Sequence, residues 1–195
     1  MLMLAIDLAR APTALVVGPM AAEEAALRRL AQLDAAMSND RGCIAVFAPA
    51  PGMRLAARAG ERLMRRLPTS EDLAGARIVF AMGLADAAAA GVAAAARSVG
   101  ALVNVEDRTA LCDFHMPALV QRGDLQIAIT TGARAPGLAG RIRRYLEHLF
   151  PRAWSARLYE LAERRRLWRA SGADRTSIGR WTDELIDRRG WLQQG

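Results

Sequence analysis

A regular alternation of short apolar segments with longer helical segments, between residues 13 and 105, is the feature that most constrains the fold. Four apolar runs, each stopped by a Gly, a Pro or an acid, are predicted to be strands: residues 13–17, 42–49, 76–82 and 101–105. Three intervening segments carry apolar residues at helical spacing: residues 20–37, 53–67 and 84–98. Strands that are apolar on both faces and alternate with helices predict a parallel sheet with helices on both sides.

A ligand site is predicted at one edge of this sheet. The carboxyl ends of parallel strands share an edge, and ligands of such folds bind just outside it. Gly18, Pro49, Gly83 and Asp107 each come just after a predicted strand. We therefore expect these four residues to gather at that edge.

The turn after the first predicted strand has only part of a dinucleotide-binding pattern. Glycines in the order G-x-G-x-x-G/A let the backbone approach a pyrophosphate at a helix N-terminus. The sequence "VVGPMAAEEA" keeps Gly18, but Met20 stands at the second glycine and Glu23 at the last small residue. Taken alone, the turn fits a parallel-sheet domain without a nucleotide as well as one that binds it.

The pattern changes after Asp107. We expect a short helix from Pro117 to about Arg122, a strand over 124–131, a Gly/Pro loop over 132–137, and helices over 138–149, 152–170 and 177–189. The expected domains are 1–112, 113–150 and 151–195. The helical tail interleaves Arg runs with Trp residues, as nucleic-acid surfaces do. Trp at helical spacing is more typical of a core or a dimer interface, and acids offset the Arg residues, so we predict no nucleic-acid partner.

Composition narrows the class of partner. The chain of 195 residues has a formal net charge of +7, which favours an anionic ligand without identifying it. Cys43 and Cys112 follow no pattern typical of a zinc site or a disulfide framework, so we expect a cytoplasmic protein. We expect no signal peptide, no membrane span and no membrane partner.

Residues 101–147 carry a specific resemblance to a known family. Their sequence "ALVNVEDRTALCDFHMPALVQRGDLQIAITTGARAPGLAGRIRRYLE" resembles the patterns N-V-x-D, C-D-F-x-x-P-A and R-G-x-L-x-I-A-I-S-T-x-G of the siroheme synthase N-terminal module family. The layout of the N-terminal half agrees as well, including the "VFAP" strand end. The resemblance covers roughly residues 4–150, and a helical tail is also usual in the family.

The resemblance implies an α/β fold, with a Rossmann-like NAD-binding domain, a small α+β dimerisation region and a C-terminal helical domain. It implies a homodimeric precorrin-2 dehydrogenase of siroheme biosynthesis, which oxidises the tetrapyrrole precorrin-2 to sirohydrochlorin with NAD. Some members of the family are also sirohydrochlorin ferrochelatases, for which ferrous iron is a further substrate.

The resemblance also implies roles for single residues. The acid of N-V-x-D is the family's catalytic residue, and it falls on Asp107. Cofactor contacts are implied at Gly18, Pro19, Met20, Ala48, Pro49, Ala81, Met82 and Gly83. Substrate contacts are implied at Asn104, Thr130, Thr131 and Gly132, to which we add His115. No residue is assigned as a metal ligand.

Proton transfer is the chemistry expected of Asp107. Dehydrogenation of a reduced tetrapyrrole removes a hydride and a proton, and metal insertion removes two pyrrole protons, so both reactions need a base. The substrate carries many carboxylates, which suits a basic protein. An isolated acid at a strand end would instead be a simple cap, and we expect Glu106 to be a solvated neighbour.

Other polar residues of the motif have two interpretations each. His115 is either a proton shuttle or metal ligand, or a packed side chain. Cys112 is either a metal-binding thiolate or, as we prefer, a small buried packing residue. Thr130 and Thr131 either bond substrate carboxylates or only end a strand.

Two departures from the family pattern keep alternative functions open. A full glycine turn and an A-T-D-D-like run, both nucleotide contacts in the family, are here "GPMAAE" and "AMGLA". The first alternative is a tetrapyrrole metal chelatase or tetrapyrrole-binding protein with a degenerate NAD site. The second is a catalytically silent Rossmann scaffold, against which the intact Asp107 argues.

Overall fold

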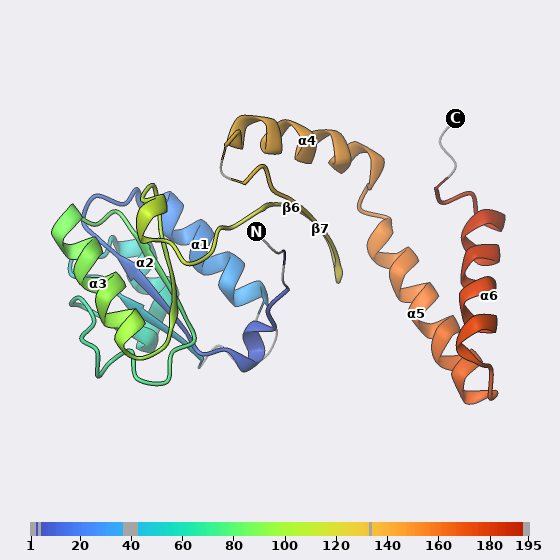
Figure 1. The fold of residues 1–195 in the computed structure, drawn as a ribbon, viewed down its shortest axis with the longest axis horizontal. Helices are drawn as coiled ribbons and strands as arrows, with labels where there is room; N and C mark the ends of the chain where they lie inside the picture. The colour runs from blue at the N-terminus through green and yellow to red at the C-terminus, as the bar shows by residue number, and fades with distance from the viewer. Residues whose placement is uncertain (1–2, 4, 37–42, 133, 193–195) are drawn as a thin grey trace. The chain divides into compact units, whose positions relative to one another are not determined.

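The chain forms two compact units, Met1–His115 and Met116–Gly195. The computed structural model describes residues 3, 5–36, 43–132 and 134–192. The first unit holds a parallel sheet with helices α1 to α3, and the second holds a β-hairpin with helices α4 to α6 (Figure 1). The Rossmann-like sheet, the small antiparallel sheet and the C-terminal helices agree with the predicted fold class.

The parallel sheet has the strand order β3-β2-β1-β4-β5. Its strands are β1 (Thr13–Val17), β2 (Ile44–Phe47), β3 (Leu63–Met64), β4 (Ile78–Met82) and β5 (Leu102–Val105). Every neighbouring pair is parallel. The order reverses between β1 and β4, so the point at which ligands bind in such sheets lies beyond the ends of these two strands.

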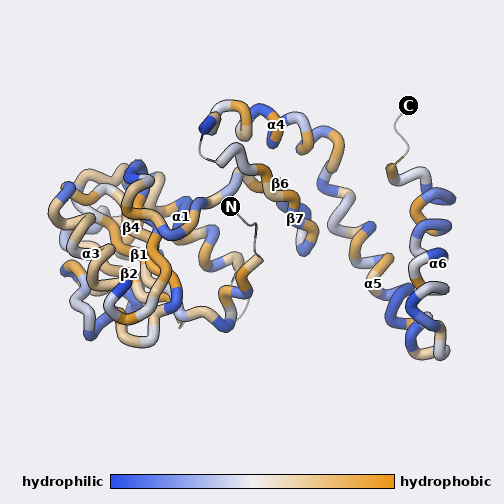
Figure 2. Tube along the Cα trace, in the orientation of Figure 1, coloured by the Kyte–Doolittle hydropathy of each residue, from blue (hydrophilic) through white to orange (hydrophobic). Residues whose placement is uncertain are grey.

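Helices cover both faces of the sheet because its central strands are apolar on both faces. Leu15 and Val17 of β1 pack in one cluster with α1 (Glu23–Ala36) and α2 (Met53–Ala59). Ala14 and Val16 pack on the opposite face with α3 (Asp86–Ser98). Figure 2 shows β1 and β4 in the hydrophobic colour. The four main strands and the helices predicted over 20–37 and 84–98 are confirmed, although residues 37–42 lie outside the described part.

The prediction of one helix over residues 53–67 is wrong beyond residue 59. Gly60 has a φ of +57°, which an α-helix cannot continue through. The chain passes through a 3-10 turn, Gly60–Arg62, into the short strand β3 beside β2. The turn is tied to α1, since the buried carboxylate of Asp34 accepts hydrogen bonds from Arg62 at 2.7 Å and from Arg58 at 2.8 Å.

The short helix predicted from Pro117 to Arg122 is also wrong. Residues Ala118–Arg122 form strand β6, which pairs antiparallel with β7 (Leu125–Ile129). Arg122 pairs with Leu125, so Gly123 and Asp124 make a two-residue turn, in which Gly123 has a φ of +60°. Such a Gly-containing two-residue loop is a hairpin signal that outweighs a helix-opening proline.

The helices of the second unit are α4 (Pro136–Leu149), α5 (Trp154–Ala170) and α6 (Arg175–Arg188). Arg122 of β6 binds the last turn of α4, because its Nε donates to Phe150 O at 2.6 Å. Asp174 caps α6 by accepting from Ser177 N at 2.7 Å. No helix in the described residues is both long and apolar enough to cross a lipid bilayer.

Candidate functional site

The ends of four parallel strands bring the predicted residues to one edge of the sheet. β1, β2, β4 and β5 run in the same direction and in register, so the residues that follow them lie along a common edge. Gly18, Ala48, Gly83 and Glu106 are the first residues beyond these strands. The predicted gathering of Gly18, the 48–49 segment, Gly83 and the Asp107 turn at this edge is therefore confirmed.

Asp107 has the most unusual backbone conformation at this edge. Its φ is +60°, and it is the one non-glycine residue with positive φ among the described residues. This left-handed conformation costs most residues about 1–2 kcal/mol, less for Asp and Asn, and is found mainly where the surrounding structure enforces it. The side chain is exposed beyond the end of β5. The backbone therefore places Asp107 at the edge where the ends of the strands meet, with its side chain toward solvent.

The thiol of Cys112 closes the turn that contains Asp107. Val105 N donates to Cys112 Sγ at 3.2 Å, and the thiol lies 3.1 Å from Val105 O and 3.3 Å from Arg108 O. A thiol has one hydrogen, so it donates to one of these carbonyls at a time. Cys112 therefore does more than fill space, because it bonds the backbone on both sides of Asp107.

An ion pair holds the far end of the same turn. Asp113 Oδ2 accepts from Val103 N at 2.9 Å, and Asp113 Oδ1 accepts from Arg97 Nη2 at 2.8 Å. Burial acts to raise the pKa of Asp113, but the hydrogen bonds from Arg97 and Val103 outweigh it, and the pKa lies below its usual value. Arg97 also donates to Leu111 O at 2.9 Å. The segment that returns from the turn is thus bound to β5 and to α3.

A second ion pair fixes the residue after Asp107. Arg108 Nη2 lies 2.6 Å from Asp86 Oδ1, at the start of α3, and Arg108 Nε lies 2.9 Å from the same oxygen. Sequence reasoning missed this pair and the Arg97–Asp113 pair. Their partners are far apart in the chain, and no local pattern marks them. Together with Cys112, they give the Asp107 turn a rigid frame.

Two of the predicted substrate residues lie near this turn in the first unit. Asn104 Nδ2 donates to Phe114 O at 2.8 Å and lies 3.6 Å from Cys112 Sγ. The amide group of Asn104 therefore helps to hold the turn, whatever else it binds. His115 is half-buried at the end of the unit and forms no hydrogen bond with any described residue.

The other predicted substrate residues lie in the second unit, in the loop between β7 and α4. Thr130 Oγ1 accepts from Gly132 N at 3.2 Å, and Thr131 Oγ1 accepts from Ala135 N at 3.2 Å. Gly132 has a φ of +62°. Both hydroxyl groups keep a hydrogen that can be donated to a ligand. The loop is therefore ordered by its own threonines and still offers two donors.

Backbone contacts occupy the turn where a dinucleotide pyrophosphate would be expected. Gly18 N donates to Met82 O at 2.8 Å, Met20 N donates to Gly83 O at 3.0 Å, and Ala21 N donates to Gly18 O at 3.2 Å. Pro19 has no N–H group to offer. The contact is tight, since a Cβ on Gly18 would lie 2.2 Å from Gly83 O. The amides of Gly18, Met20 and Ala21 are therefore bound to the protein itself.

Two carboxylates stand at the start of the helix that follows. Glu23 Oε1 accepts from Arg54 N at 3.0 Å and from Leu55 N at 3.1 Å, and so binds the first amides of α2. Glu24 forms an ion pair with Arg54. A pyrophosphate needs free amides and positive potential at this helix end. The charges of Glu23 and Glu24 in the first turn of α1 therefore oppose a pyrophosphate there, although the bonds of Glu23 are made to α2 and not to the amides of α1.

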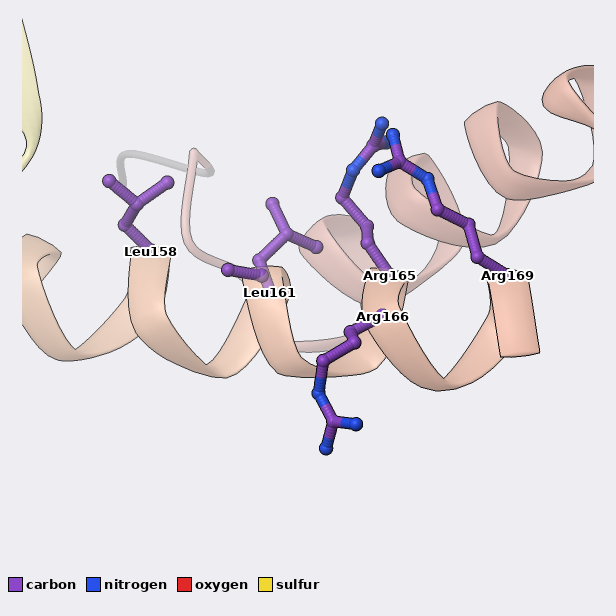
Figure 3. A pocket seen from close by; sticks show the side chains of 6 residues that line it. Leu158, Leu161, Arg165, Arg166 and Arg169 are labelled. Atoms are coloured by element: carbon purple, nitrogen blue, oxygen red, sulfur yellow. The ribbon is translucent and has the colours of Figure 1, made fainter.

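A shallow hollow on the second unit contains none of the residues predicted for the site. It has a volume of about 350 Å³ and is lined by α5. Leu158, Leu161, Arg165 and Arg169 project from one side of the helix, whereas Arg166 points to the other side (Figure 3). Arg166 is bound to Glu163 at 2.9 Å. The hollow is a groove along a single helix, with no buried polar group directed into it among the described residues.

Sequence comparison places most of the chain in a family. Residues 4–118 match the family described as "Putative NAD(P)-binding". A siroheme synthase of Methylococcus capsulatus is 38% identical over 108 residues, which are 55% of this chain and 23% of that protein. A siroheme synthase of Pseudomonas entomophila is 40% identical over 146 residues, which are 72% of this chain and 30% of that protein. The chain thus spans less than a third of the length of these curated relatives.

Structure comparison agrees with the observed architecture. The solved structure of SirC, precorrin-2 dehydrogenase, matches with a TM-score of 0.75 and covers 99% of this chain and 93% of its own. Its sequence identity is 23%, so the similarity is one of fold.

Proposed function

Because the chain belongs to the siroheme synthase N-terminal module family, we propose that it is an enzyme of siroheme synthesis that acts on the tetrapyrrole precorrin-2. The observation that carries this proposal is the Asp107 turn. The family motif falls on the one described non-glycine residue with a left-handed backbone, at the ligand-binding edge of the sheet. Strain of this kind clusters at catalytic residues.

The first candidate reaction is the dehydrogenation of precorrin-2 to sirohydrochlorin. Asp107 is the proposed base, and it takes the proton that leaves the reduced ring. The Cys112 bonds and the two ion pairs support the backbone of the turn that carries it. NAD is the oxidant that the family implies, and the negative charge of Glu23 at the start of α1 opposes its pyrophosphate.

The second candidate reaction is the insertion of ferrous iron into sirohydrochlorin. In this reaction two pyrrole protons leave as the metal enters, so a base is needed and a dinucleotide is not. The turn at Gly18 favours this reaction, because the amides of Gly18, Met20 and Ala21 are already bound and the charge of Glu23 opposes a pyrophosphate. Asp107 has the same role in both reactions, as the group that accepts protons from the tetrapyrrole.

Anaerobic incubation with precorrin-2, with and without NAD, followed by absorbance, separates the two reactions. Sirohydrochlorin that forms only with NAD supports the dehydrogenase. Faster iron insertion into supplied sirohydrochlorin, without any oxidation of precorrin-2, supports the chelatase. Asp107→Asn is the control, since Asn tolerates the same backbone conformation but is a far weaker base. The proposal is contradicted if neither reaction occurs, or if Asp107→Asn keeps full activity.

We also propose that the second unit packs against a second copy of this chain. Its buried hydrophobic residues, among those described, are Val120, Ala139, Ile178 and Leu185. Helix α4 is amphipathic, yet Leu138 is 53% exposed and Tyr145 is 64% exposed. A two-stranded sheet with so few buried side chains needs further packing to be stable. A homodimer supplies that packing.

A cytoplasmic location is part of the same proposal. Cys112 is a reduced thiol, and its hydrogen bonds join the strand before Asp107 to the loop after it. Oxidation of the thiol would break these bonds. A reducing compartment preserves them.

A further inference from the structure

Arg29 lies on an aromatic platform beside the Asp107 turn. It belongs to α1, and its Cζ atom lies 5.1 Å from the centre of the Phe80 ring. The edge of Phe114 packs on Phe80, with ring centres 5.5 Å apart. The carbonyl of Phe114 is in turn bound by Asn104 at 2.8 Å. The guanidinium group of Arg29 is thus supported by the same segment that frames Asp107.

Arg29 differs from the other half-buried arginines of the first unit in having no carboxylate at ion-pair distance among the described residues. Within its described residues these are Arg29, Arg62 and Arg108. Arg62 is paired with Asp34 at 2.7 Å, and Arg108 is paired with Asp86 at 2.6 Å. Arg29 donates one hydrogen bond, to Gln32 at 3.2 Å, and forms no ion pair with a described residue. A partly buried guanidinium with unused donors is costly unless an anion binds it.

Strand register brings Arg29 to the end of β5 that leads into the Asp107 turn. Phe80, under the guanidinium, pairs directly with Asn104 of β5. Glu106 is two residues further along, so strand alternation places its side chain on the same face as Asn104. Burial lowers the pKa of Arg29, and the charge of Glu106 partly offsets this effect. Arg29 therefore lies within electrostatic reach of the residue that precedes Asp107.

We propose that Arg29 binds a carboxylate of the tetrapyrrole substrate and so sets the position of the ring relative to Asp107. The inference rests on the proposed function for the nature of the substrate. A guanidinium presents two parallel N–H donors to a carboxylate, and stacking on Phe80 fixes the plane of that fork. The tetrapyrroles of this reaction carry many carboxylates, so one of them can bind Arg29 while the ring faces Asp107.

The test compares Arg29→Met with Arg28→Met in the full chain. Methionine keeps the apolar stem over Phe80 but removes the charge, and Arg28 is an exposed neighbour on the same helix. The probe is sirohydrochlorin, and the readout is its dissociation constant by fluorescence quenching at low and high salt. Arg29→Met is expected to weaken binding about tenfold or more, whereas Arg28→Met changes it less than about threefold. Equal effects of the two variants would overturn the proposal.

Two further variants keep the test decisive. Arg29→Lys keeps the charge without the planar fork, so its affinity should lie between those of the wild type and Arg29→Met, even if Arg29→Met folds poorly. Glu106→Gln removes the acid that competes with the ligand and should tighten binding. If Glu106→Gln restores full affinity when it is combined with Arg29→Met, Arg29 only neutralises Glu106 and the proposal fails.

The failure of this inference is distinguishable from that of the proposed function. Asp107→Asn should abolish turnover while it keeps the affinity for sirohydrochlorin, because it leaves Arg29 in place. Normal turnover of Asp107→Asn, with weak binding by Arg29→Met, would refute the proposed catalytic role and support the carboxylate site. Loss of turnover in Asp107→Asn, with normal binding by Arg29→Met, would support the catalytic role of Asp107 and refute the carboxylate site at Arg29.

Discussion

Stability and activity make opposite demands on Asp107. Its carboxylate is placed by a backbone conformation that a residue with a Cβ adopts only at a cost. Glycine at this position would remove both the cost and the carboxylate. We therefore expect Asp107→Gly to raise the free energy of unfolding by up to about 1 kcal/mol and to lower turnover by about 10²-fold or more. Urea denaturation and a precorrin-2 assay on the same preparation measure the two effects.

Asp107→Ala is the matched variant, since it also removes the carboxylate but keeps the Cβ. It should lose turnover to the same extent without any gain in stability. Equal stabilities of the Gly and Ala variants would show that the conformation of residue 107 is not strained in solution.

The Asp113–Arg97 ion pair predicts how stability depends on pH. The pKa of Asp113 is lowered in the folded state. The contribution of its carboxylate to the free energy of unfolding is therefore complete above the unfolded pKa of about 3.9, and it is lost as the pH falls through the folded pKa. The difference in unfolding free energy between the wild type and Asp113→Asn should thus shrink as the pH falls from about 6 to about 3. Denaturation at several pH values measures it, and a difference that is constant with pH would contradict the assignment.

Single residues were predictable from the sequence where a motif marks them. Asp107 stands in N-V-x-D, and its place at the strand end follows from the strand pattern alone. Cys112 was expected only to pack, because its bonds depend on how the turn folds back onto β5. Arg29 and Arg97 carry no local signal at all. In a chain whose basic residues are all arginine, composition does not distinguish a buried one from the rest.

Among the elements, α1 and α2 are joined by a carboxylate in the first turn of α1. Glu23 binds the first amides of α2, and its charge opposes a pyrophosphate at the start of α1. Glu23→Ala should therefore lower the free energy of unfolding by about 1 kcal/mol and raise the affinity for NAD or NADP about fivefold. Calorimetric titration and thermal unfolding measure the two changes.

Glu24→Ala serves as the control for this variant. It also removes one negative charge from the first turn of α1, but its partner is the exposed side chain of Arg54. We expect a smaller loss of stability for it, since exposed ion pairs contribute little. A gain in dinucleotide affinity that is the same in both variants would mean that net charge, rather than the Glu23 contact, limits binding.

Element prediction succeeded where apolar periodicity was long and failed where one glycine redirected the chain. The strands and helices of residues 13–105 follow from burial on both faces, which leaves a continuous apolar run in each strand. Gly60 ends α2 early, although apolar residues continue at helical spacing through Leu67. The segment Ala118–Arg122 forms a strand because its partner β7 and the turn at Gly123 define it. A pairing of that kind is not visible in the first strand alone.

At the scale of the whole molecule, the exposed face of α4 allows a test of the proposed homodimer. Tyr145 on α4 is 64% exposed, beside a hairpin with little buried surface. If a second copy covers this face, Tyr145→Arg should shift the protein from dimer to monomer in light scattering and lower its melting temperature by several degrees. Arg144→Glu, an exposed residue about 100° round the same helix, is a control for surface charge. A monomeric wild type would rule out the dimer.

The contact between Glu23 and the start of α2 also restricts the mutational paths open to this protein. A Cβ on Gly52 would lie 2.0 Å from Glu23 Oε1, so the residue tolerated at position 52 depends on the residue at position 23. A library that randomises position 52 should favour glycine when Glu23 is present, and should accept alanine or serine more readily once position 23 is alanine. A side chain at position 52 displaces the Glu23 carboxylate from Arg54 N and Leu55 N, so it also loosens the start of α2.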